Sequence, residues 1–113
     1  MEGGLWVGTY LASNRFITHL DLSDNRLGRE SGKAIAEMIS ENSILQTLLL
    51  KGNAFTDKEA ELIGAALGMN MSIKVIDLSY NDIGDSGISS LGAGLAGNNN
   101  IEVLNLGGSN ICI

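Results

Sequence analysis

The residues of this sequence that could carry out chemistry are few, and the most recognisable group is a glycine motif. Residues 92–97 read GAGLAG, which has the G-x-G-x-x-G spacing of a dinucleotide-binding loop. Such a loop binds pyrophosphate when its first glycine directly follows a strand and opens a helix. Here the motif falls about a dozen residues past the nearest expected strand, inside a helical pattern. We therefore predict no nucleotide cofactor, and a helix whose small residues pack closely on a neighbour.

A general base or a metal site could be built from His19 and Asp21, which lie beside each other on one expected strand, with Asp77 two repeats later at the phase of Asp21. The sequence has one histidine, however, and no nucleophile with a base at a recognisable spacing. Its one cysteine, Cys112, cannot form an internal disulfide and belongs to no cluster that could hold zinc. We predict no catalytic residue, no metal and no cofactor, so the protein is not expected to be an enzyme.

The charge balance is acidic, with 13 Asp and Glu against 7 Lys and Arg and a formal net charge of -6. This charge repels phosphate backbones and anionic lipid, so neither nucleic acid nor a membrane is a predicted partner. The sequence has no basic N-terminal segment followed by an apolar core, and no run of ~20 apolar residues. With one cysteine, a cytoplasmic location is the expectation. The acidic excess provides solubility or, alternatively, steers a basic partner.

A repeat organises the whole chain. Ile17, Leu45, Ile73 and Ile101 begin segments that start 28 residues apart, and the first three follow the template L-x-x-L-x-L-x-x-N-x-L. In the fourth segment Ser109 stands where the asparagine belongs. Within each segment the period-two alternation, as at Leu20 and Leu22, predicts a short strand with one face inward.

The second half of each repeat changes to a helical period. Its apolar stripe reads Ala34, Ile35, Met38, Ile39, then Leu62, Ile63, Ala66, Leu67, then Ser90, Leu91, Gly94, Leu95. The helices are expected to stop at Asn42, Asn70 and Asn98, a residue type that tolerates a left-handed turn. The third helix should be the weakest, because its three glycines each cost about 1 kcal/mol relative to alanine.

One domain accommodates the 113 residues. We divide it into a helical half-repeat (1–16), full repeats (17–44, 45–72 and 73–100) and a truncated terminal repeat (101–113). The half-repeat places Trp6, Val7, Tyr10 and Leu11 on its apolar stripe. Both ends look cut, so we expect a fragment of a longer array.

This pattern resembles the leucine-rich repeat superfamily, and its 28-residue unit is similar to the ribonuclease-inhibitor-like class of NOD-like receptors and the Ran GTPase-activating protein. The resemblance implies an α/β fold, a curved right-handed solenoid. Four short parallel strands would lie on its concave side and the helices on its convex side. Independently of the name, stacked units at ~4.8 Å strand spacing share a core that no single unit can form.

Asn25, Asn53 and Asn81 are predicted to be structural. A tight turn after each strand buries backbone groups, and a stacked amide can satisfy those of its own turn and the next. The sequon at residues 70–72, NMS, is interpreted as inert because no secretory signal precedes it.

Function is predicted to reside on the outward strand positions. They read His19, Asp21, Ser23; Thr47, Leu49, Lys51; Val75, Asp77, Ser79; and Val103, Asn105, Gly107, with Tyr80 at the rim. An apolar centre with a polar margin is typical of a binding patch, although isolated exposed apolar residues are also common.

The leading hypothesis is a non-catalytic module that binds a protein partner through these concave positions. One alternative is a regulator in the style of the Ran GTPase-activating protein, for which Asn25, Arg26 and Arg29 are the comparable polar and basic set. Another is a purely structural segment of a larger parent. Nothing in the sequence covers Ile101, Leu104 and Leu106, so we also expect self-association through the fourth strand, or fraying from about residue 101.

Overall fold

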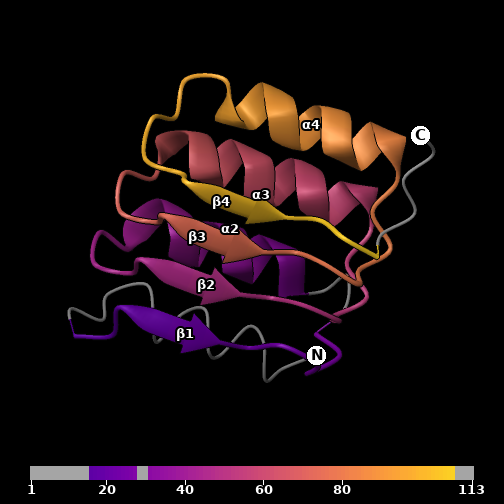
Figure 1. Cartoon of the computed structure of the whole chain (residues 1–113), viewed down its shortest axis with the longest axis horizontal. Helices are drawn as coiled ribbons and strands as arrows, with labels where there is room; N and C mark the ends of the chain where they lie inside the picture. Colours follow the sequence, from indigo (N-terminus) through magenta and orange to yellow (C-terminus); the bar gives the residue numbers. More distant parts are fainter. Residues whose placement is uncertain (1–15, 28–30, 109–113) are drawn as a thin grey trace.

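The chain, examined as a computed structural model, is described over residues 16–27 and 31–108. Short strands alternate with helices in the order β1 (His19–Asp21), α2 (Gly32–Glu41), β2 (Thr47–Leu49), α3 (Asp57–Met69), β3 (Val75–Asp77), α4 (Asp85–Leu95) and β4 (Val103–Asn105). The strands form one parallel sheet in the order β1-β2-β3-β4, with the helices stacked behind it (Figure 1). The predicted α/β repeat fold is confirmed.

The strand register follows the repeat. Leu20 pairs with Leu48, Leu48 with Ile76, and Ile76 with Leu104, so each pair is 28 residues apart. A shift of one residue would turn the apolar side chains to the outside, so the inward leucines select this register. The outward residues are thereby aligned in rows across the sheet.

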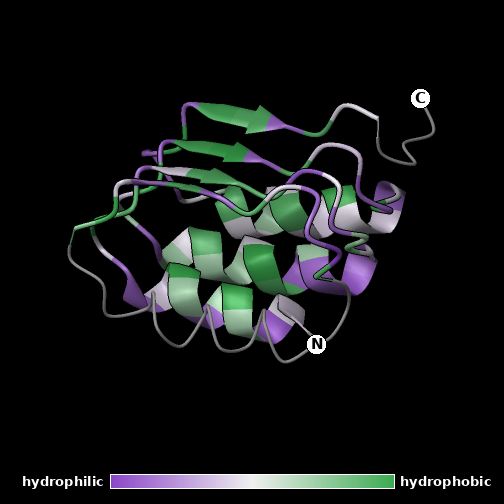
Figure 2. Ribbon diagram, turned by 90° about the horizontal axis from the view of Figure 1, so that it is seen from below, coloured by the Kyte–Doolittle hydropathy of each residue, from purple (hydrophilic) through white to green (hydrophobic). Residues whose placement is uncertain are grey.

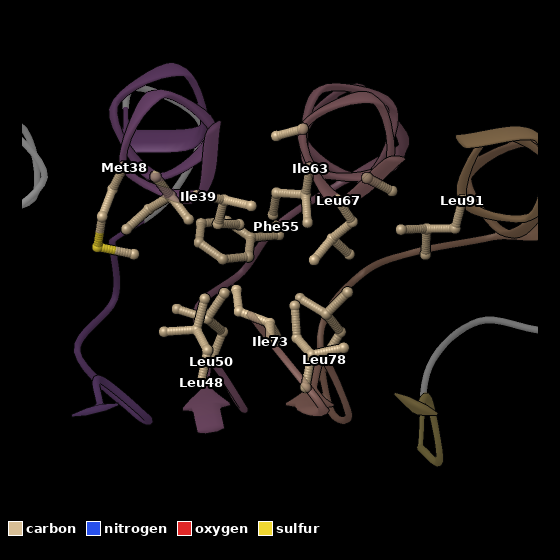
Figure 3. Close-up of a cluster of buried hydrophobic side chains, with 14 of the residues drawn as sticks. Met38, Ile39, Leu48, Leu50, Phe55, Ile63, Leu67, Ile73, Leu78 and Leu91 are labelled. Atoms are coloured by element: carbon tan, nitrogen blue, oxygen red, sulfur yellow. The ribbon is translucent and has the colours of Figure 1, made fainter. Parts of the chain in front are cut away.

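The core lies between the sheet and the helices. Figure 3 shows Met38 and Ile39 of α2, Ile63 and Leu67 of α3, and Leu91 of α4 facing the inward side chains near the strands, among them Leu48, Leu50, Phe55, Ile73 and Leu78. All of these are buried, and each contributes roughly 1.5–3 kcal/mol relative to exposure. In the hydropathy colouring, the strands are largely apolar and apolar segments alternate with polar ones along the helices (Figure 2).

The helix ends differ from the prediction in their backbone. Asn42 and Asn70 directly follow α2 and α3, as expected, but their φ of -86° is extended rather than left-handed. Helix α4 ends earlier, at Leu95, so Gly97 lies outside it and Asn98 lies beyond its end. The predicted left-handed turn is therefore wrong, and the asparagines have a different role that is described below.

The glycines of α4 do not all serve the same purpose. A Cβ on Gly94 would lie 2.1 Å from the carbonyl oxygen of Gly64, so α3 and α4 touch through their backbones there. A Cβ on Gly92 or Gly97 would meet nothing within 4 Å. Gly94 is thus the member of the glycine motif that packs against the neighbouring helix.

Several predicted features lie outside the described residues. They are the half-repeat residues Trp6, Val7, Tyr10 and Leu11, the basic Arg29, and, at the other end, Ser109 and Cys112.

Candidate protein-binding face

Ten side chains predicted to bind a partner lie at outward or rim positions of the sheet, a surface we call the outer sheet face. They are His19, Asp21, Thr47, Leu49, Lys51, Val75, Asp77, Tyr80, Val103 and Asn105. Pairing aligns His19, Thr47, Val75 and Val103 in one row, and Asp21, Leu49, Asp77 and Asn105 in a second. The parallel register thus brings together residues that are up to 84 positions apart, since three 28-residue steps separate the outer strands.

An apolar band crosses this face from β2 to β4. Leu49 and Val75 are partly exposed, while Val103 is 51% exposed and Tyr80 is 66% exposed. These side chains cannot enter the core, because their buried neighbours Leu48 and Ile76 occupy the inward side of the same strands. The outer sheet face therefore keeps accessible apolar surface within a polar margin.

The polar members of the second row also stabilise the turns that follow the strands. The Oδ1 atoms of Asp21, Asp77 and Asn105 accept hydrogen bonds from the backbone N–H two residues later, at 2.9, 2.9 and 3.0 Å. Hydrogen bonds from Ser23, with His19 and Lys51 adding favourable charge, lower the pKa of Asp21. At the equivalent position β2 carries Leu49, which cannot accept such a bond.

One position predicted to point outward is buried. Ser79 is 3% exposed, and its hydroxyl donates to the Asp77 carboxylate. Ser79 is therefore engaged within its own turn and is not part of the accessible face. The sequence could have suggested this contact, because an Asx turn pairs an Asp with the residue two positions later.

Tyr80 occupies an unusual backbone position. Its φ is 55°, in the left-handed region, and Gly52 and Gly108 stand at the equivalent positions of the neighbouring repeats with φ of 68° and 78°. The Tyr80 ring lies against Gly108, where an added Cβ would come within 2.6 Å of two ring carbons. The Nζ atom of Lys51 lies 5.6 Å from the centre of the same ring, a cation–π distance.

Beside the sheet, the turn asparagines link successive repeats. Asn53 Oδ1 accepts from the backbone N–H of Asn25 and Leu27, at 3.0 and 3.2 Å, and its Nδ2 donates to the carbonyl of Leu22 at 2.9 Å. Asn81 makes the same bonds one repeat later. Asn25 differs, because it is exposed and its own Nδ2 donates only locally, to Ser23, within the described residues.

A second asparagine ladder, which sequence reasoning missed, runs along the loops before the strands. Asn70 Nδ2 donates to the carbonyls of Ile39 and Asn42 at 2.8 and 2.9 Å, and Asn98 Nδ2 donates to Leu67 and Asn70 at 2.6 and 2.9 Å. Their Oδ1 atoms accept hydrogen bonds from the backbone N–H groups two and three residues later. Their 28-residue spacing was the available signal. The burial of Asn70 also keeps the sequon amide engaged in the fold.

A hollow of about 260 Å³ lies away from the outer sheet face, among the loops that follow α2 and α3. It is bordered by Met69 and Met71, which are 74% and 82% exposed, together with polar residues such as Ser40 and Glu41. These side chains offer no charged pair or nucleophile arranged for a reaction.

Within residues 16–27 and 31–108, no three His, Cys, Asp or Glu side chains come together in a group that could hold a metal ion. None of the helices in this part of the chain combines the length and apolar character needed to cross a membrane.

Comparison with known proteins supports the class of fold. A family model described as "Leucine Rich repeat" matches residues 13–36 and 70–92, which supports the predicted leucine-rich-repeat family. No curated protein sequence matches the chain.

Two solved structures share this architecture. One is titled Leiomodin-1 Actin-Binding Site 2; it is 20% identical, has a TM-score of 0.79, and the match covers 97% of this chain and 62% of that one. The other is a tropomodulin C-terminal domain from Caenorhabditis elegans, 12% identical, with a TM-score of 0.79 and coverage of 96% and 64%. The chain thus spans less than two thirds of either neighbour. At these identities the similarity establishes the leucine-rich-repeat fold, while the ribonuclease-inhibitor-like class stays a prediction.

Proposed function

We propose that this chain is a non-catalytic interaction module that binds a protein partner through the outer sheet face. The observation that carries the proposal is the apolar band of Leu49, Val75, Val103 and Tyr80, which remains accessible on the outer sheet face. Val75 and Val103 are paired in one row, Leu49 lies in the second row, and Tyr80 lies at the rim. Aromatic and aliphatic side chains surrounded by polar groups are the usual anchors of protein interfaces. The comparisons offer no support for the alternative of a GTPase-activating protein.

Rigidity favours the same face. The strands are held in one register by backbone pairing, and the turns behind Asp21, Asp77 and Asn105 are fixed by their own hydrogen bonds. A preorganised surface loses little conformational entropy on binding. One of the structures with this fold is titled as an actin-binding site, so actin is the first individual protein that should be tested for binding by titration.

The test compares partner capture by the immobilised chain and by three face variants, Leu49→Asp, Val75→Asp and Tyr80→Ala. We expect each variant to lose the captured protein while its circular dichroism stays unchanged, because these side chains lie outside the core. The matched control is Glu37→Arg, an exposed position on α2. Capture that survives the face substitutions but is lost in Glu37→Arg would assign binding to the helical side instead.

A further inference from the structure

The structure already places one ammonium group over an exposed aromatic ring on the outer sheet face. Lys51 Nζ lies 5.6 Å from the centre of the Tyr80 ring, and no carboxylate within the described residues lies close enough to Lys51 to form a salt bridge. Lys51 belongs to the preceding repeat and Gly108 to the following one, so the ring is positioned between two repeats. The distance lies within the range of a cation–π contact.

The backbone at Tyr80 gives an independent reason to examine this ring. A bulky residue with a φ of 55° is uncommon; the repeats on either side use glycine at this position, and the first repeat uses Asp24 with a φ of 58°. The turn itself therefore does not require an aromatic side chain. Strained residues of this kind concentrate at functional sites, which indicates that the side chain, rather than the turn, is what Tyr80 supplies.

The charges around the ring favour a cation over an anion. On the outer sheet face, Asp21 and Asp77 flank Leu49, and Lys51 is the face's only lysine or arginine. Both carboxylates keep hydrogen-bonding capacity beyond the turn contacts that they already make. The exposed Asp24 side chain lies against Gly52. The whole chain carries a net charge of -6. Both the local and the overall field attract a basic partner.

We propose that the outer sheet face binds a basic polypeptide segment, with a lysine or arginine side chain of the partner replacing Lys51 on the Tyr80 ring. Other basic side chains of the partner would pair with the carboxylates of Asp77 and Asp21, which lie on either side of Leu49, while neighbouring apolar side chains contact Leu49 and Val75. This inference rests on the proposed function of the same face. Lys51 acts as an internal competitor that covers the ring until the partner displaces it.

The sign of the Lys51→Ala effect separates this arrangement from its opposite. Removing Lys51 uncovers the ring and makes the face more negative, so a basic ligand should bind about two- to fivefold more tightly. If Lys51 instead receives an acidic partner, the same substitution weakens binding. Lys58→Ala is the matched control, because it removes the same charge from an exposed position on α3, where Lys58 pairs with Glu61 at 3.6 Å.

The experiment titrates the isotope-labelled chain with two blocked decapeptides, one alternating valine with arginine and one alternating valine with glutamate. Backbone amide shifts report both the affinity and the face that is contacted. We expect the arginine peptide to shift residues of the outer sheet face, and to bind more weakly as salt is added. Tyr80→Leu should weaken this binding about two- to fivefold. Tyr80→Phe, which keeps the ring, should bind like the unsubstituted chain.

The outcomes distinguish the two proposals. Preference for the glutamate peptide, or weaker arginine-peptide binding in Lys51→Ala, would overturn the basic-segment inference while leaving the outer sheet face as the binding surface. Shifts confined to α2 and α3 would place the peptide on the helical side and overturn the basic-segment inference. If neither peptide shifts the outer sheet face, the basic-segment inference is wrong, and the capture experiment alone decides the function. A change in Lys58→Ala equal to that in Lys51→Ala would attribute the effect to net charge and remove the role of the ring.

Discussion

The second and fourth strands carry the same apolar template but differ in how much of it is buried. Leu45, Leu48 and Leu50 are buried, whereas their equivalents Ile101, Leu104 and Leu106 are only partly buried. The second strand has a paired strand on each side and lies in front of packed helices, while the fourth pairs only with β3 among the described strands. Burial in this fold is therefore decided by the neighbours of a repeat, even where the residue types are the same.

The turn asparagines show the same contrast between an inner repeat and an outer one, here in their hydrogen bonds. Asn53 is buried and joins two repeats through both ends of its amide, while Asn25, at the same position of the first repeat, is exposed. An identical residue is thus a structural link in the interior and a turn residue at the edge. Substitutions at matched positions can measure how steeply the contribution falls.

The largest difference is expected in the apolar core. Leu48→Ala should reduce the free energy of unfolding by about 2–5 kcal/mol, because the side chain is fully buried between the sheet and the helices. Leu104→Ala should lose less than half as much, since Leu104 is only partly buried. Urea denaturation followed by circular dichroism measures both. Equal losses would mean that the fourth repeat is packed as tightly as the second.

Next in size is the asparagine comparison. Asn53→Ala leaves the buried N–H of Leu27 and other backbone groups without partners, at about 1–3 kcal/mol each, and should lower the thermal midpoint. Asn25→Ala should change stability by less than about 0.5 kcal/mol, as surface substitutions usually do. Asn53→Asp keeps the acceptor but places a buried carboxylate against the carbonyls of Leu22 and Leu50, so it should destabilise the chain at least as much as Asn53→Ala. An unchanged midpoint in Asn53→Ala would show that its turn is satisfied by other groups.

A smaller effect, opposite in sign between two sites, is expected in α4. Gly94→Ala forces a Cβ against the Gly64 carbonyl and should destabilise the chain by about 1–3 kcal/mol. Gly92→Ala has open space and should stabilise it by up to about 1 kcal/mol, because alanine favours the helix. Thermal unfolding of the two variants tests the sign. Stabilisation by both would mean that α3 and α4 can separate without loss.

The subtlest expectation concerns the edge of β4. Its partly buried apolar residues and its place at the edge of the described strands predict either self-association of the isolated chain at high concentration or faster amide exchange in β4 than in β2. Light scattering over a concentration series, combined with amide exchange, separates these. A monomer at every concentration with a well-protected β4 contradicts both versions.

The strand positions and the inward residues were predictable because the same pattern of apolar residues occurs four times in the sequence. A leucine two residues from another, returning every 28 positions, can only be one side of a stacked strand, and Leu48, Ile76 and Leu104 pair accordingly. Nine of the ten residues of the candidate face follow from the same alternation, and Tyr80 lies beside it at the rim. Whether they bind a partner is a separate question, which the proposed experiments address.

Other features depend on contacts between repeats, which the sequence of one repeat does not indicate. The 28-residue spacing of Asn70 and Asn98 is visible in the sequence, which predicts a left-handed turn at each. Nothing local indicates that their amides reach carbonyls 28 and 31 residues earlier. The burial of Ser79 and the approach of Lys51 to Tyr80 likewise depend on side-chain directions after folding.

The sequence by itself determined the period, the inward apolar positions and the α/β repeat fold, because hydrophobic periodicity is a property of each repeat alone. The tertiary structure decided which leucines are fully buried, which glycine packs against a helix, and which asparagines connect repeats. These depend on the neighbouring repeat. Side-chain hydrogen bonds and close backbone contacts act over a few ångströms, so they exist only once stacking has brought residues 28 positions apart into contact.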